Sequence, residues 1–369
     1  MQLKQGTLLQ GGKYKIETAL GRGSFGITYL AKTSLMAQGN LGSIKVEVKI
    51  AIKEFFMEQV NSRQSDGSSV EGSSGSVFVN YRKKFKKEAE NLSHLSHPHI
   101  VKVLDVFDEN NTTYYAMEFL DGTNLDDYIR QKGRLKESEA VAITQQIGEA
   151  LSYMHTHKML HLDVKPKNVM VKPDGTCCLI DFGLSKQFTE DGELESSTSI
   201  GLGTPGYAPI EQHSYTQDGT FPATLDVYAL GATLFKMLTG KRPPEATVIL
   251  NEGFPRTALA GPGISDHVMA VVENAMEPVR KKRYQDVRAL LRALASDDTE
   301  ETIIEQPADV LTMQESHSQQ DSTTNQTKEP VKQAPMENSF VVKLIYCLSA
   351  IIPLFCTMFI LIDSCNRNS

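Results

Sequence analysis

The sequence lacks the cysteine patterns that hold small or metal-dependent domains together. The chain has 369 residues and five cysteines, which are Cys177, Cys178, Cys347, Cys356 and Cys365. They form no CxxC pair, and no histidine stands at metal-ligand spacing from them. This distribution argues against a disulfide framework and against a zinc site, and it fits a folded part that resides in a reducing compartment.

The chain also lacks an excess of positive charge. Its formal net charge of −7 argues against binding to bulk nucleic acid. Residues 297–339 contain ten acidic and two basic side chains and carry −8, so the remainder of the chain carries +1. This segment is rich in Gln, Ser and Thr and poor in aromatic residues, so it cannot bury enough apolar surface to offset the cost of ordering. We expect a disordered acidic linker over 297–339.

Long apolar runs are absent except near the C-terminal end. Residues 1–10 contain no apolar run, so no N-terminal signal peptide is expected. Residues 344–362 are nineteen residues without a formal charge, and as a helix they would measure about 28 Å, close to the thickness of a bilayer's hydrocarbon core. The alternatives are a buried core helix and a docking helix for a partner, but a core helix does not fit beyond a disordered linker. We expect one transmembrane helix over 341–362 and a short tail over 363–369.

The stretch from His161 to Gly183 contains the residue types that phosphoryl transfer requires. Asp163 is followed by Lys165 and by the amide of Asn168, and a second carboxylate, Asp181, opens an Asp-Phe-Gly triplet. The reaction needs a positioned hydroxyl, neutralised phosphate charge and hard oxygen ligands for a divalent cation. Taken singly, these residues could be turn, cap or strand-end residues. Together they supply a base, a cation and two oxygen ligands suited to magnesium.

A glycine-rich turn lies between two predicted strands near the N-terminus. Gly21, Gly23 and Gly26 form the pattern GxGxxG within residues 14–30, which alternate loosely and contain aromatic and β-branched residues. The same pattern opens dinucleotide-binding folds, where it leads from a strand into a helix. Here the residues after Gly26 continue as a strand. On this fragment alone, a phosphate-covering loop and a plain hairpin turn are equally compatible with the pattern.

Two charged residues lie in regular elements that follow. Lys53 ends an apolar strand, and Glu88 lies on a predicted helix over 81–95. A lysine or glutamate in such a place is usually exposed to solvent. Each residue therefore indicates a functional site only if the two form a pair. The sequence also predicts an extended β-hairpin tip over 31–47 and, from its Ser and Gly content, a flexible insertion over 61–76.

The remaining chain predicts two strands and three helices. Their expected ranges are 100–107 and 113–119 for the strands, and 138–157, 224–240 and 284–296 for the helices. Apolar residues at steps of four, four and three define the first of these helices, and Ser138 is its expected N-cap.

As a set, these motifs resemble those of protein kinases. The segment GTPGYAPIEQ at 203–212 is similar to the end of the activation segment in bacterial-type (Hanks-type) Ser/Thr kinases. The resemblance covers about residues 14–296. It implies an α+β, bilobal fold, with a small N-lobe of five strands and one helix at about 14–119 and a larger helical C-lobe at about 120–296.

The resemblance implies that ATP binds between the lobes. The matching cofactor-binding positions are Leu20, Gly21, Gly23, Gly26, Thr28, Ala51, Lys53, Glu88, Met117, Glu118 and Leu120. Lys53 would hold the α- and β-phosphates and pair with Glu88. Met117 would guard the back of the adenine pocket, and backbone groups of Glu118 to Leu120 would contact the base.

The resemblance also assigns the catalytic and metal positions. Asp163 would accept or orient the proton of the substrate hydroxyl, and Lys165 would neutralise the γ-phosphate. Thr204 with Lys165 is the pair expected of a Ser/Thr enzyme. Asn168 and Asp181 would hold Mg²⁺, which bridges the phosphates.

Two further residues resemble structural positions of the family. Asp226, in the first turn of the helix over 224–240, resembles the aspartate that anchors the catalytic loop. Arg283 resembles the arginine that pairs with the position of Glu211, and such a buried pair would be costly to break singly.

The chain departs from the family pattern at three places. The family's His-Arg-Asp reads His-Leu-Asp here, and Leu162 cannot pair with a phosphate on the activation segment. We therefore expect that phosphorylation of this segment is not the main switch by that route. Thr28 replaces the usual valine but keeps its β-branched shape, so ATP binding is expected to be kept. Before Glu211, Pro209 and Ile210 replace Ala and Pro, so that motif matches in part.

The sequence thus predicts an ATP-dependent protein Ser/Thr kinase that acts on protein substrates and not on nucleic acid. A single membrane anchor would leave the kinase in the cytoplasm, with any signal from outside supplied by a membrane partner. One alternative is a catalytically silent kinase-fold scaffold, against which the intact Lys53, Asp163, Asn168 and Asp181 argue. The other is a small-molecule kinase, against which the segment over 203–212 argues.

Overall fold

The computed structural model of the chain describes nine stretches, residues 2–23, 26–39, 42–57, 61–72, 76–182, 186–187, 203–214, 222–261 and 263–296. They all belong to one compact unit, Met1–Ile303. The expected linker over 297–339, transmembrane helix over 341–362 and tail over 363–369 lie outside the described residues. Within the stretches above, no helix is both long enough and apolar enough to cross a membrane.

The unit contains strands in its first half and mostly helices in its second. The strands are β1 Leu8–Leu9, β2 Tyr14–Gly23, β3 Gly26–Gly39, β4 Gly42–Phe55, β5 Asn61–Arg63, β6 Val70–Gly72, β7 Val103–Glu109, β8 Thr112–Glu118, β9 Thr123–Asn124, β10 Met159–Leu160, β11 Val169–Val171, β12 Cys177–Leu179 and β13 Lys186–Gln187. The α-helices are α1 Ser76–Ser93, α2 Leu125–Lys132, α3 Glu137–Thr156, α4 Ile210–Ser214, α5 Thr224–Thr239, α6 Ala246–Glu252, α7 Arg256–Leu259, α8 Asp266–Ala275 and α9 Val287–Ala295. The 3₁₀ turns are η1 Pro166–Asn168 and η2 Arg280–Lys282.

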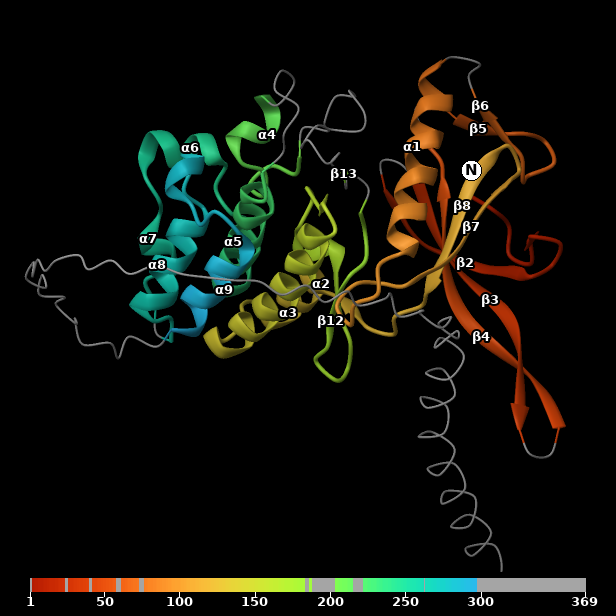
Figure 1. The fold of residues 1–369 in the computed structure, drawn as a ribbon, viewed down its shortest axis with the longest axis horizontal. Helices are drawn as coiled ribbons and strands as arrows, with labels where there is room; N and C mark the ends of the chain where they lie inside the picture. Colours follow the sequence, from red (N-terminus) through yellow and green to blue (C-terminus); the bar gives the residue numbers. More distant parts are fainter. Residues whose placement is uncertain are drawn as a thin grey trace, which may run out of the picture. The chain divides into compact units, whose positions relative to one another are not determined.

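The main sheet is antiparallel and has six strands in the order β1-β2-β3-β4-β8-β7 (Figure 1). The resemblance implied five strands. The sixth is the short β1, in which Leu8 pairs with Lys15 and Leu9 with Tyr14. It comes from residues before the expected start of the lobe at 14, and Leu9 is fully buried against the sheet. The predicted β-rich N-lobe is present, and the chain before residue 14 also contributes to it.

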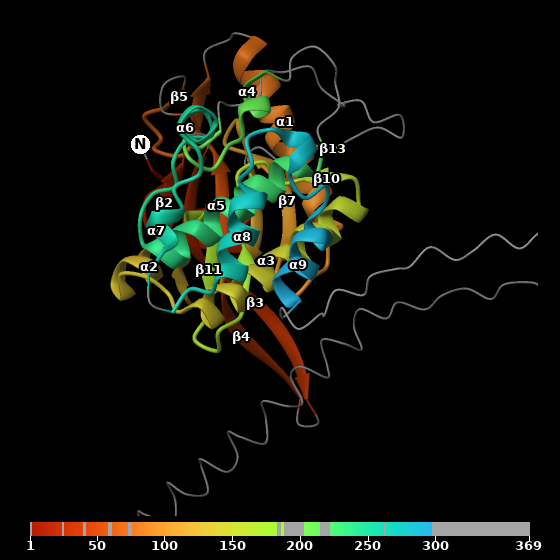
Figure 2. The ribbon, with the colours of Figure 1, turned by 90° about the vertical axis from the view of Figure 1, so that its left-hand side faces the viewer.

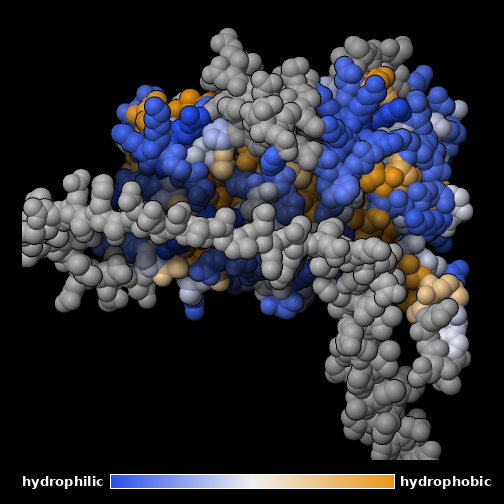
Figure 3. All heavy atoms as spheres, in the orientation of Figure 1, coloured by the Kyte–Doolittle hydropathy of each residue, from blue (hydrophilic) through white to orange (hydrophobic). Residues whose placement is uncertain are grey.

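A long two-stranded ribbon extends from this sheet (Figure 2). β3 and β4 pair without interruption from Gly26 opposite Phe55 to Gly39 opposite Gly42, which confirms the hairpin expected over 31–47. On its outer part, Leu35 and Ile44 are exposed by 52% and 67%. Figure 3 shows apolar residues on this ribbon among largely hydrophilic surroundings.

The insertion predicted to be flexible contains a small hairpin instead. β5 and β6 pair through three residue pairs, and Arg63 at the end of β5 donates to the fully buried carboxylate of Glu54. The hydroxyl groups of Tyr29 and Tyr114 donate to the same carboxylate at 2.8 and 2.7 Å. A buried charge is stable only with such partners. Residues 61–72 thus form an ordered hairpin where an irregular insertion was predicted, because these bonds to Glu54 outweigh local composition. Residues 73–75 of the predicted insertion lie outside the described part of the chain.

The helix α1 covers one face of the sheet and packs against β7 and β8. Its buried side chains Phe78, Phe85, Ala89 and Leu92 recur at helical spacing and form the apolar face that faces the strands. The predicted helix over 81–95 therefore exists, although it begins earlier, at Ser76, and ends at Ser93.

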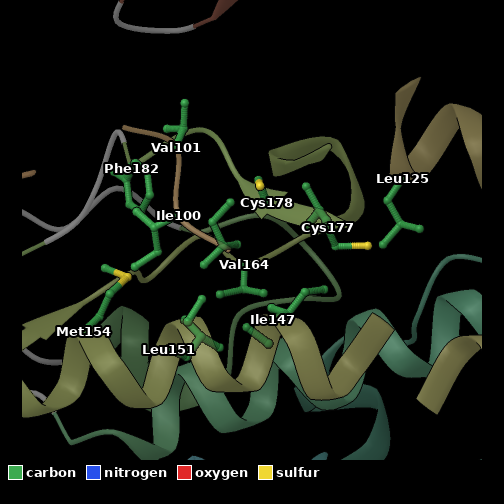
Figure 4. Packing of buried hydrophobic residues seen from close by; sticks show 14 of the residues in the cluster. Ile100, Val101, Leu125, Ile147, Leu151, Met154, Val164, Cys177, Cys178 and Phe182 are labelled. Carbon is green, nitrogen blue, oxygen red and sulfur yellow. The ribbon is translucent and has the colours of Figure 1, made fainter. Parts of the chain in front are cut away.

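The helical part is organised around α3 and α5. The helix α5 is buried over nearly its whole length and packs against α3, α8 and α9. In α3, Ile147, Leu151 and Met154 project toward Ile100 and Val164 in the core (Figure 4). This confirms the predicted apolar periodicity. The predicted N-cap was wrong, because α3 begins at Glu137, its N-cap is Lys136, and Ser138 lies inside the first turn.

The end of α5 requires glycine. Gly240 adopts the left-handed conformation with φ +70°, and a Cβ at this position would lie 2.0 Å from the carbonyl oxygen of Gly133. A side chain is therefore excluded both by conformation and by space. The end of α5 therefore packs closely against the loop between α2 and α3.

Candidate active site

The β11–β12 hairpin brings Asn168 and Asp181 together. Val169 pairs with Leu179 in the antiparallel register, so the residue before β11 and the residues after β12 lie at the same end of the hairpin. The backbone N–H of Ile180 donates to the carbonyl of Asn168 at 3.0 Å. The two residues predicted as magnesium ligands are thirteen positions apart in sequence, and the hairpin places them at neighbouring points of the backbone.

Asp163 is surrounded by donors from three predicted site residues. Lys165 Nζ donates to one carboxylate oxygen at 2.6 Å, and the hydroxyl of Thr204 donates to the other at 2.8 Å. Lys165 Nζ also donates to the Thr204 hydroxyl at 2.8 Å. Asn168 Nδ2 donates to the Asp163 carboxylate at 3.0 Å and to its backbone carbonyl at 2.9 Å. The structure thus brings Thr204 into contact with a loop about forty residues earlier in the chain.

The loop that carries Asp163 is held from below by Asp226. This fully buried carboxylate accepts the backbone N–H groups of His161 and Leu162 at 2.9 and 2.8 Å. It also contacts His155 Nε2 at 2.8 Å. Burial raises the pKa of Asp226, but hydrogen bonds and charge attraction from His155 and His161 outweigh it, so the pKa lies below its usual value. Asp226 therefore occupies the anchoring place that the resemblance assigned to it.

Leu162 has an unusual backbone conformation for a leucine. Its φ is +64°, and its side chain is buried. The two N–H bonds to Asp226 fix one side of this turn, and the carbonyl of Leu162 accepts from Gln212 Nε2 at 2.9 Å on the other. Such strain persists only where surrounding bonds over-determine the conformation. A buried leucine at this position offers nothing that a phosphate could bind.

Several of the predicted cofactor-binding residues lie on one face of the main sheet. In register, Gly21 lies opposite Thr28, Thr28 opposite Lys53, and Lys53 opposite Tyr115. Side chains of directly opposed residues share a face, and so do residues two apart on one strand. Ala51 lies two residues before Lys53 on β4 and is paired with Met117 on β8. Both therefore share the face of Lys53. The sheet places these separate segments in one row.

The glycines of the turn differ in what their neighbours allow. A Cβ at Gly26 would lie 2.4 Å from the backbone oxygen of Glu54, so close packing in the protein requires glycine there. A Cβ at Gly21 would meet no atom within 4 Å, and one at Gly23 only an oxygen at 3.9 Å. Packing among the described residues does not require these two glycines, which leaves space beside the backbone for a ligand. Leu20, directly before them, is 49% exposed.

Lys53 pairs with Asp181. The two atoms Lys53 Nζ and Asp181 Oδ1 are 2.6 Å apart, and the lysine is buried. Burial is the largest single influence on the pKa of Lys53 and lowers it, but the hydrogen bond and charge of Asp181, together with the nearby Tyr115 and Glu88, raise it more, so the ammonium form is strongly favoured. This ion pair joins the sheet to the loop that follows β12.

Glu88 does not form the expected ion pair with Lys53. Within the described part of the chain, its carboxylate makes no ion pair, and the Lys53 ammonium contacts Asp181 instead. Loss of water around Glu88 raises its pKa well above the usual value, and the attraction of Lys53 offsets this only in part. Glu88 keeps partial solvent exposure, yet its charge is poorly compensated. The structure brings it near Lys53 without completing the pair.

The residues predicted to form a hinge lie at and just after the end of β8. Met117 and Leu120 are buried. The backbone N–H of Glu118 donates to the carbonyl of Lys102 at 3.0 Å, so this group is already occupied. Leu120 N–H makes no hydrogen bond to another residue of the described stretches. Of the backbone donors expected to contact the base, Leu120 is therefore better placed than Glu118.

The donor set fits a magnesium ion carried by phosphates. The described residues contain no cluster of three or more His, Cys, Asp or Glu that could hold a metal by themselves. Mg²⁺ usually binds one or two protein oxygens together with substrate phosphates and water. Among the described residues, both hydrogen bonds of the Asn168 side chain use Nδ2, which leaves its amide oxygen available to a cation. With Asp181, it would provide two oxygen ligands for a divalent cation carried by phosphates.

Arg283 and Glu211 form the predicted pair. Arg283 NH1 lies 2.8 Å from Glu211 Oε1 and donates to the carbonyl of Thr224 at 2.7 Å. Its Nε donates to the carbonyl of Glu277 at 3.0 Å, and its guanidinium lies over the ring of Tyr228. The pair joins α4, which follows the segment with Thr204, to the base of α5.

The prediction missed three residues that contact or adjoin the site. Tyr115 lies opposite Lys53, and the alternation of β8 could have revealed it, because Tyr115 stands two residues before Met117. His155 and Gln212 contact Asp226 and Leu162. Nothing in their local sequence indicates this, because the partners are far along the chain. Gly183 and the predicted activation-segment hydroxyls at 185–199 lie outside the described side chains.

The family of the chain follows from these motifs and from comparison with known sequences. The family described as "Protein kinase domain" matches residues 14–301, more than half of the chain. The chain belongs to the protein kinase family. The bilobal fold expected of that family agrees with the β-sheet and helical parts described above. This kinase domain is the part of the chain that contains every predicted site residue.

Curated relatives of the kinase domain include three bacterial proteins. The chain is 33% identical over 220 residues to the probable serine/threonine-protein kinase PknB of Lactococcus lactis. This match covers 58% of the chain and 34% of the relative. It is 29% identical over 232 residues to the serine/threonine-protein kinase PrkC of Bacillus subtilis, covering 63% and 31%. It is 29% identical over 289 residues to the serine/threonine-protein kinase PknE of Mycobacterium bovis, covering 76% and 45%. The match spans less than half the length of each relative.

Proposed function

We propose that the protein is an ATP-dependent protein serine/threonine kinase. The observation that carries this proposal is the contact of Lys165 and Thr204 with each other and with the Asp163 carboxylate. A phosphotransferase needs a carboxylate at the acceptor hydroxyl and a cation near the transferred group. Both are present on a loop that Asp226 holds rigid. The names of the relatives support the choice of Ser and Thr as acceptors.

In the proposed reaction, Asp163 orients the Ser or Thr hydroxyl and accepts its proton. The hydroxyl oxygen forms a bond to the γ-phosphorus while the bond from that phosphorus to the β–γ bridging oxygen breaks, and the electron pair stays on the departing ADP. Lys165 neutralises charge on the transferred phosphoryl group. Bound Mg²⁺–ATP supplies the phosphoryl group with part of its charge already neutralised. Asn168 and Asp181 would hold the metal, and Lys53 the α- and β-phosphates.

The two alternatives make different predictions for the same assay. The purified full chain is incubated with labelled ATP and a general protein acceptor, and phosphosites are mapped. We expect label on Ser and Thr, and a loss of about 10²–10⁴-fold in Asp163→Asn, because the carboxylate that accepts the proton is gone. Equal background labelling in both proteins would indicate a silent kinase-fold scaffold. Label found only on small molecules would indicate a small-molecule kinase.

The contact between Lys165 and Thr204 can be tested separately. Thr204→Ser keeps the hydroxyl that bridges Lys165 and Asp163, whereas Thr204→Val keeps only the shape. We expect Thr204→Ser to retain most of the activity and Thr204→Val to lose about 10-fold or more, because Lys165 is then held by Asp163 alone. Equal activity of both variants would contradict a role for the hydroxyl.

We further propose that the kinase domain at 14–296 is followed by a disordered linker at 297–339 and a membrane anchor at 341–362. The support is the charge-free run of nineteen residues beyond an acidic segment without aromatic residues. Because ATP is cytosolic, the kinase domain would face the cytoplasm and take up external signals through a membrane partner. Removal of residues 341–369 should release the protein from the membrane fraction. Continued membrane association of the truncated chain would contradict the anchor.

A further inference from the structure

Tyr115 is a buried tyrosine that faces the same side of the sheet as Lys53. It lies on β8 directly opposite Lys53 in the register, and only 2% of its surface is exposed. Its ring packs against Phe85 of α1, with the ring centroids 5.2 Å apart. Lys53 Nζ lies 5.8 Å from the centroid of the Tyr115 ring. The phenol therefore lies between α1, which carries Glu88, and the lysine of the candidate site.

The hydroxyl of Tyr115 has no completed hydrogen bond. Its oxygen is buried, and no group in the described stretches satisfies the geometry of a bond to it, although the Lys53 ammonium approaches it closely enough to interact. Burial raises the pKa of the phenol, as do the charges of Asp181 and Glu88, while Lys53 lowers it. The group is thus a neutral hydroxyl that can donate one hydrogen bond and accept others.

Packing does not explain this hydroxyl. Phenylalanine has the same ring without the polar atom, and a buried hydroxyl without a partner destabilises the folded state. The neighbouring Tyr114 shows the contrast, because its hydroxyl donates to Glu54 at 2.7 Å and accepts from Asn110 at 3.1 Å. Tyr115 keeps a hydroxyl that the described conformation does not use. Local rules are most often broken in this way at functional sites.

We propose that Tyr115 is a positioning residue that holds the Lys53 ammonium in place when Asp181 binds the metal. The inference rests on the proposed function, in which Asp181 is a metal ligand. In the described conformation the ammonium is bound by Asp181 at 2.6 Å. Once that carboxylate shares its charge with a cation, Lys53 would have the α- and β-phosphates as partners but would lose part of its hold on the protein. The Tyr115 hydroxyl offers an oxygen partner from the protein itself, on a rigid central strand and without adding charge.

The proposal also explains why Glu88 alone does not suffice. Glu88 forms no ion pair with Lys53 among the described residues, and its raised pKa shows that its charged form is not well stabilised. A helix side chain reaches Lys53 only if α1 is suitably placed. Tyr115 lies directly opposite Lys53 in the pairing of β8 with β4, so the sheet itself sets the position of its backbone relative to that of Lys53.

The test compares three tyrosine-to-phenylalanine variants of the purified full chain. Tyr115→Phe removes the proposed contact. Tyr228→Phe is the matched control, because its hydroxyl is also buried without a partner among the described residues but lies beside Arg283 and outside the site. Tyr114→Phe removes a hydroxyl with two partners. Thermal unfolding, kcat and KM for ATP are measured for all three and for the parent chain.

We expect Tm to be unchanged or higher in Tyr115→Phe and Tyr228→Phe, and lower in Tyr114→Phe. Only Tyr115→Phe should raise KM for ATP, by about 5-fold or more, because the hydrogen bond between the Tyr115 hydroxyl and the Lys53 ammonium is lost. A purely structural role would not separate KM from Tm in this way. Parent-like kcat and KM in Tyr115→Phe would overturn the proposal, and so would a Tm loss like that of Tyr114→Phe.

Failure of the proposed function gives a different result. If the parent chain transfers no phosphate, kinase activity fails, and the affinity for Mg²⁺–ADP is measured by calorimetry instead. A weaker affinity in Tyr115→Phe than in Tyr228→Phe would still support the positioning role. Equal affinities, or no binding of Mg²⁺–ADP by the parent chain, would overturn it.

Discussion

The ammonium of Lys53 lies 2.6 Å from a carboxylate oxygen of Asp181, and Glu88 makes no ion pair with it among the described residues. One cation therefore faces two acids but binds only one. Asp181 gains a partner, whereas the pKa of Glu88 rises well above its usual value, chiefly through loss of water. The described conformation thus differs from the arrangement in which Lys53 and Glu88 pair.

Glu88→Gln should stabilise the protein at neutral and alkaline pH. The pKa of Glu88 is raised in the folded state, so the folded protein keeps a proton that the unfolded chain releases above about pH 4.5. The stability contributed by Glu88 is therefore fully present below this pH and is lost as the pH rises through the folded-state pKa. Glutamine cannot lose a proton. The Tm of Glu88→Gln should therefore exceed that of the parent by an amount that grows as the pH rises above about 4.5, reaching about 2 °C near pH 8.

The measurement is thermal unfolding of both proteins between pH 4 and pH 8. Glu90→Gln, on the exposed side of the same helix, is the control and should show no such pH-dependent difference. A Glu88→Gln variant that is less stable than the parent at pH 8 would show that Glu88 is ionised in a stabilising ion pair.

Gly26→Ala should destabilise the fold, whereas Gly23→Ala should not. The Cβ at position 26 would lie 2.4 Å from the Glu54 carbonyl oxygen, which belongs to the strand backbone and cannot move aside. Overpacking of this kind costs about 1–3 kcal/mol. At position 23 the nearest atom is 3.9 Å away. Urea unfolding of the two variants checks the difference.

The same pair of variants separates structure from ligand binding. If Gly23 leaves room for phosphates, Gly23→Ala should raise KM for ATP while its unfolding midpoint stays at the parent value. A Gly23→Ala variant with parent-like KM would argue that this part of the loop is a plain turn. Equal stability of the two variants would contradict the packing difference.

Arg283→Met should be among the most destabilising single changes in the helical part. The side chain is buried, and its loss leaves Glu211 and the carbonyl of Thr224 without their partner. Breaking a buried ion pair from one side costs about 3–5 kcal/mol. Lys281→Met, on an exposed side chain of the preceding 3₁₀ turn, is the control and should change stability by less than about 0.5 kcal/mol. Similar urea midpoints for the two variants would contradict this prediction.

Alanine at every Ser and Thr of residues 185–199 should leave most of the kinase activity intact. The residue before Asp163 is the buried Leu162, whose backbone is held by Asp226 and Gln212. It has no charge with which to bind a phosphate on the activation segment. Phosphotransfer by the alanine variant is compared with that of the parent chain and of Asp163→Asn. Loss of activity to the level of Asp163→Asn, with an unchanged Tm, would contradict the prediction.

Much of the candidate site could be predicted because its parts are local. Asp163, Lys165 and Asn168 lie within six residues of one another, so their spacing reveals a common loop. Strand alternation likewise predicts that Lys53 and Ala51 share a face, and the register confirms the geometry of their strand. The apolar period of α3 was readable for the same reason. Such patterns survive because a helix or strand imposes its repeat on every residue that it contains.

Contacts between distant segments could not be predicted from composition. The insertion after β4 is rich in Ser and Gly, yet it contains a hairpin whose Arg63 shares the buried Glu54 carboxylate with the distant Tyr29 and Tyr114. Ser138 is a favourable N-cap residue, but α3 begins one residue before it. In the insertion, the energy of these tertiary contacts exceeds the local preference.

The order and spacing of charged residues and glycines alone determined that the chain belongs among phosphate-transferring proteins, and which side chains form its site. Only the tertiary structure decided which acid binds Lys53, and that a buried tyrosine hydroxyl lies near it without a completed hydrogen bond among the described residues. The reason is physical. Residue type follows from the chemistry that each position must perform, whereas the choice among several possible partners depends on distances and on the exclusion of water, which exist only after distant segments have packed together.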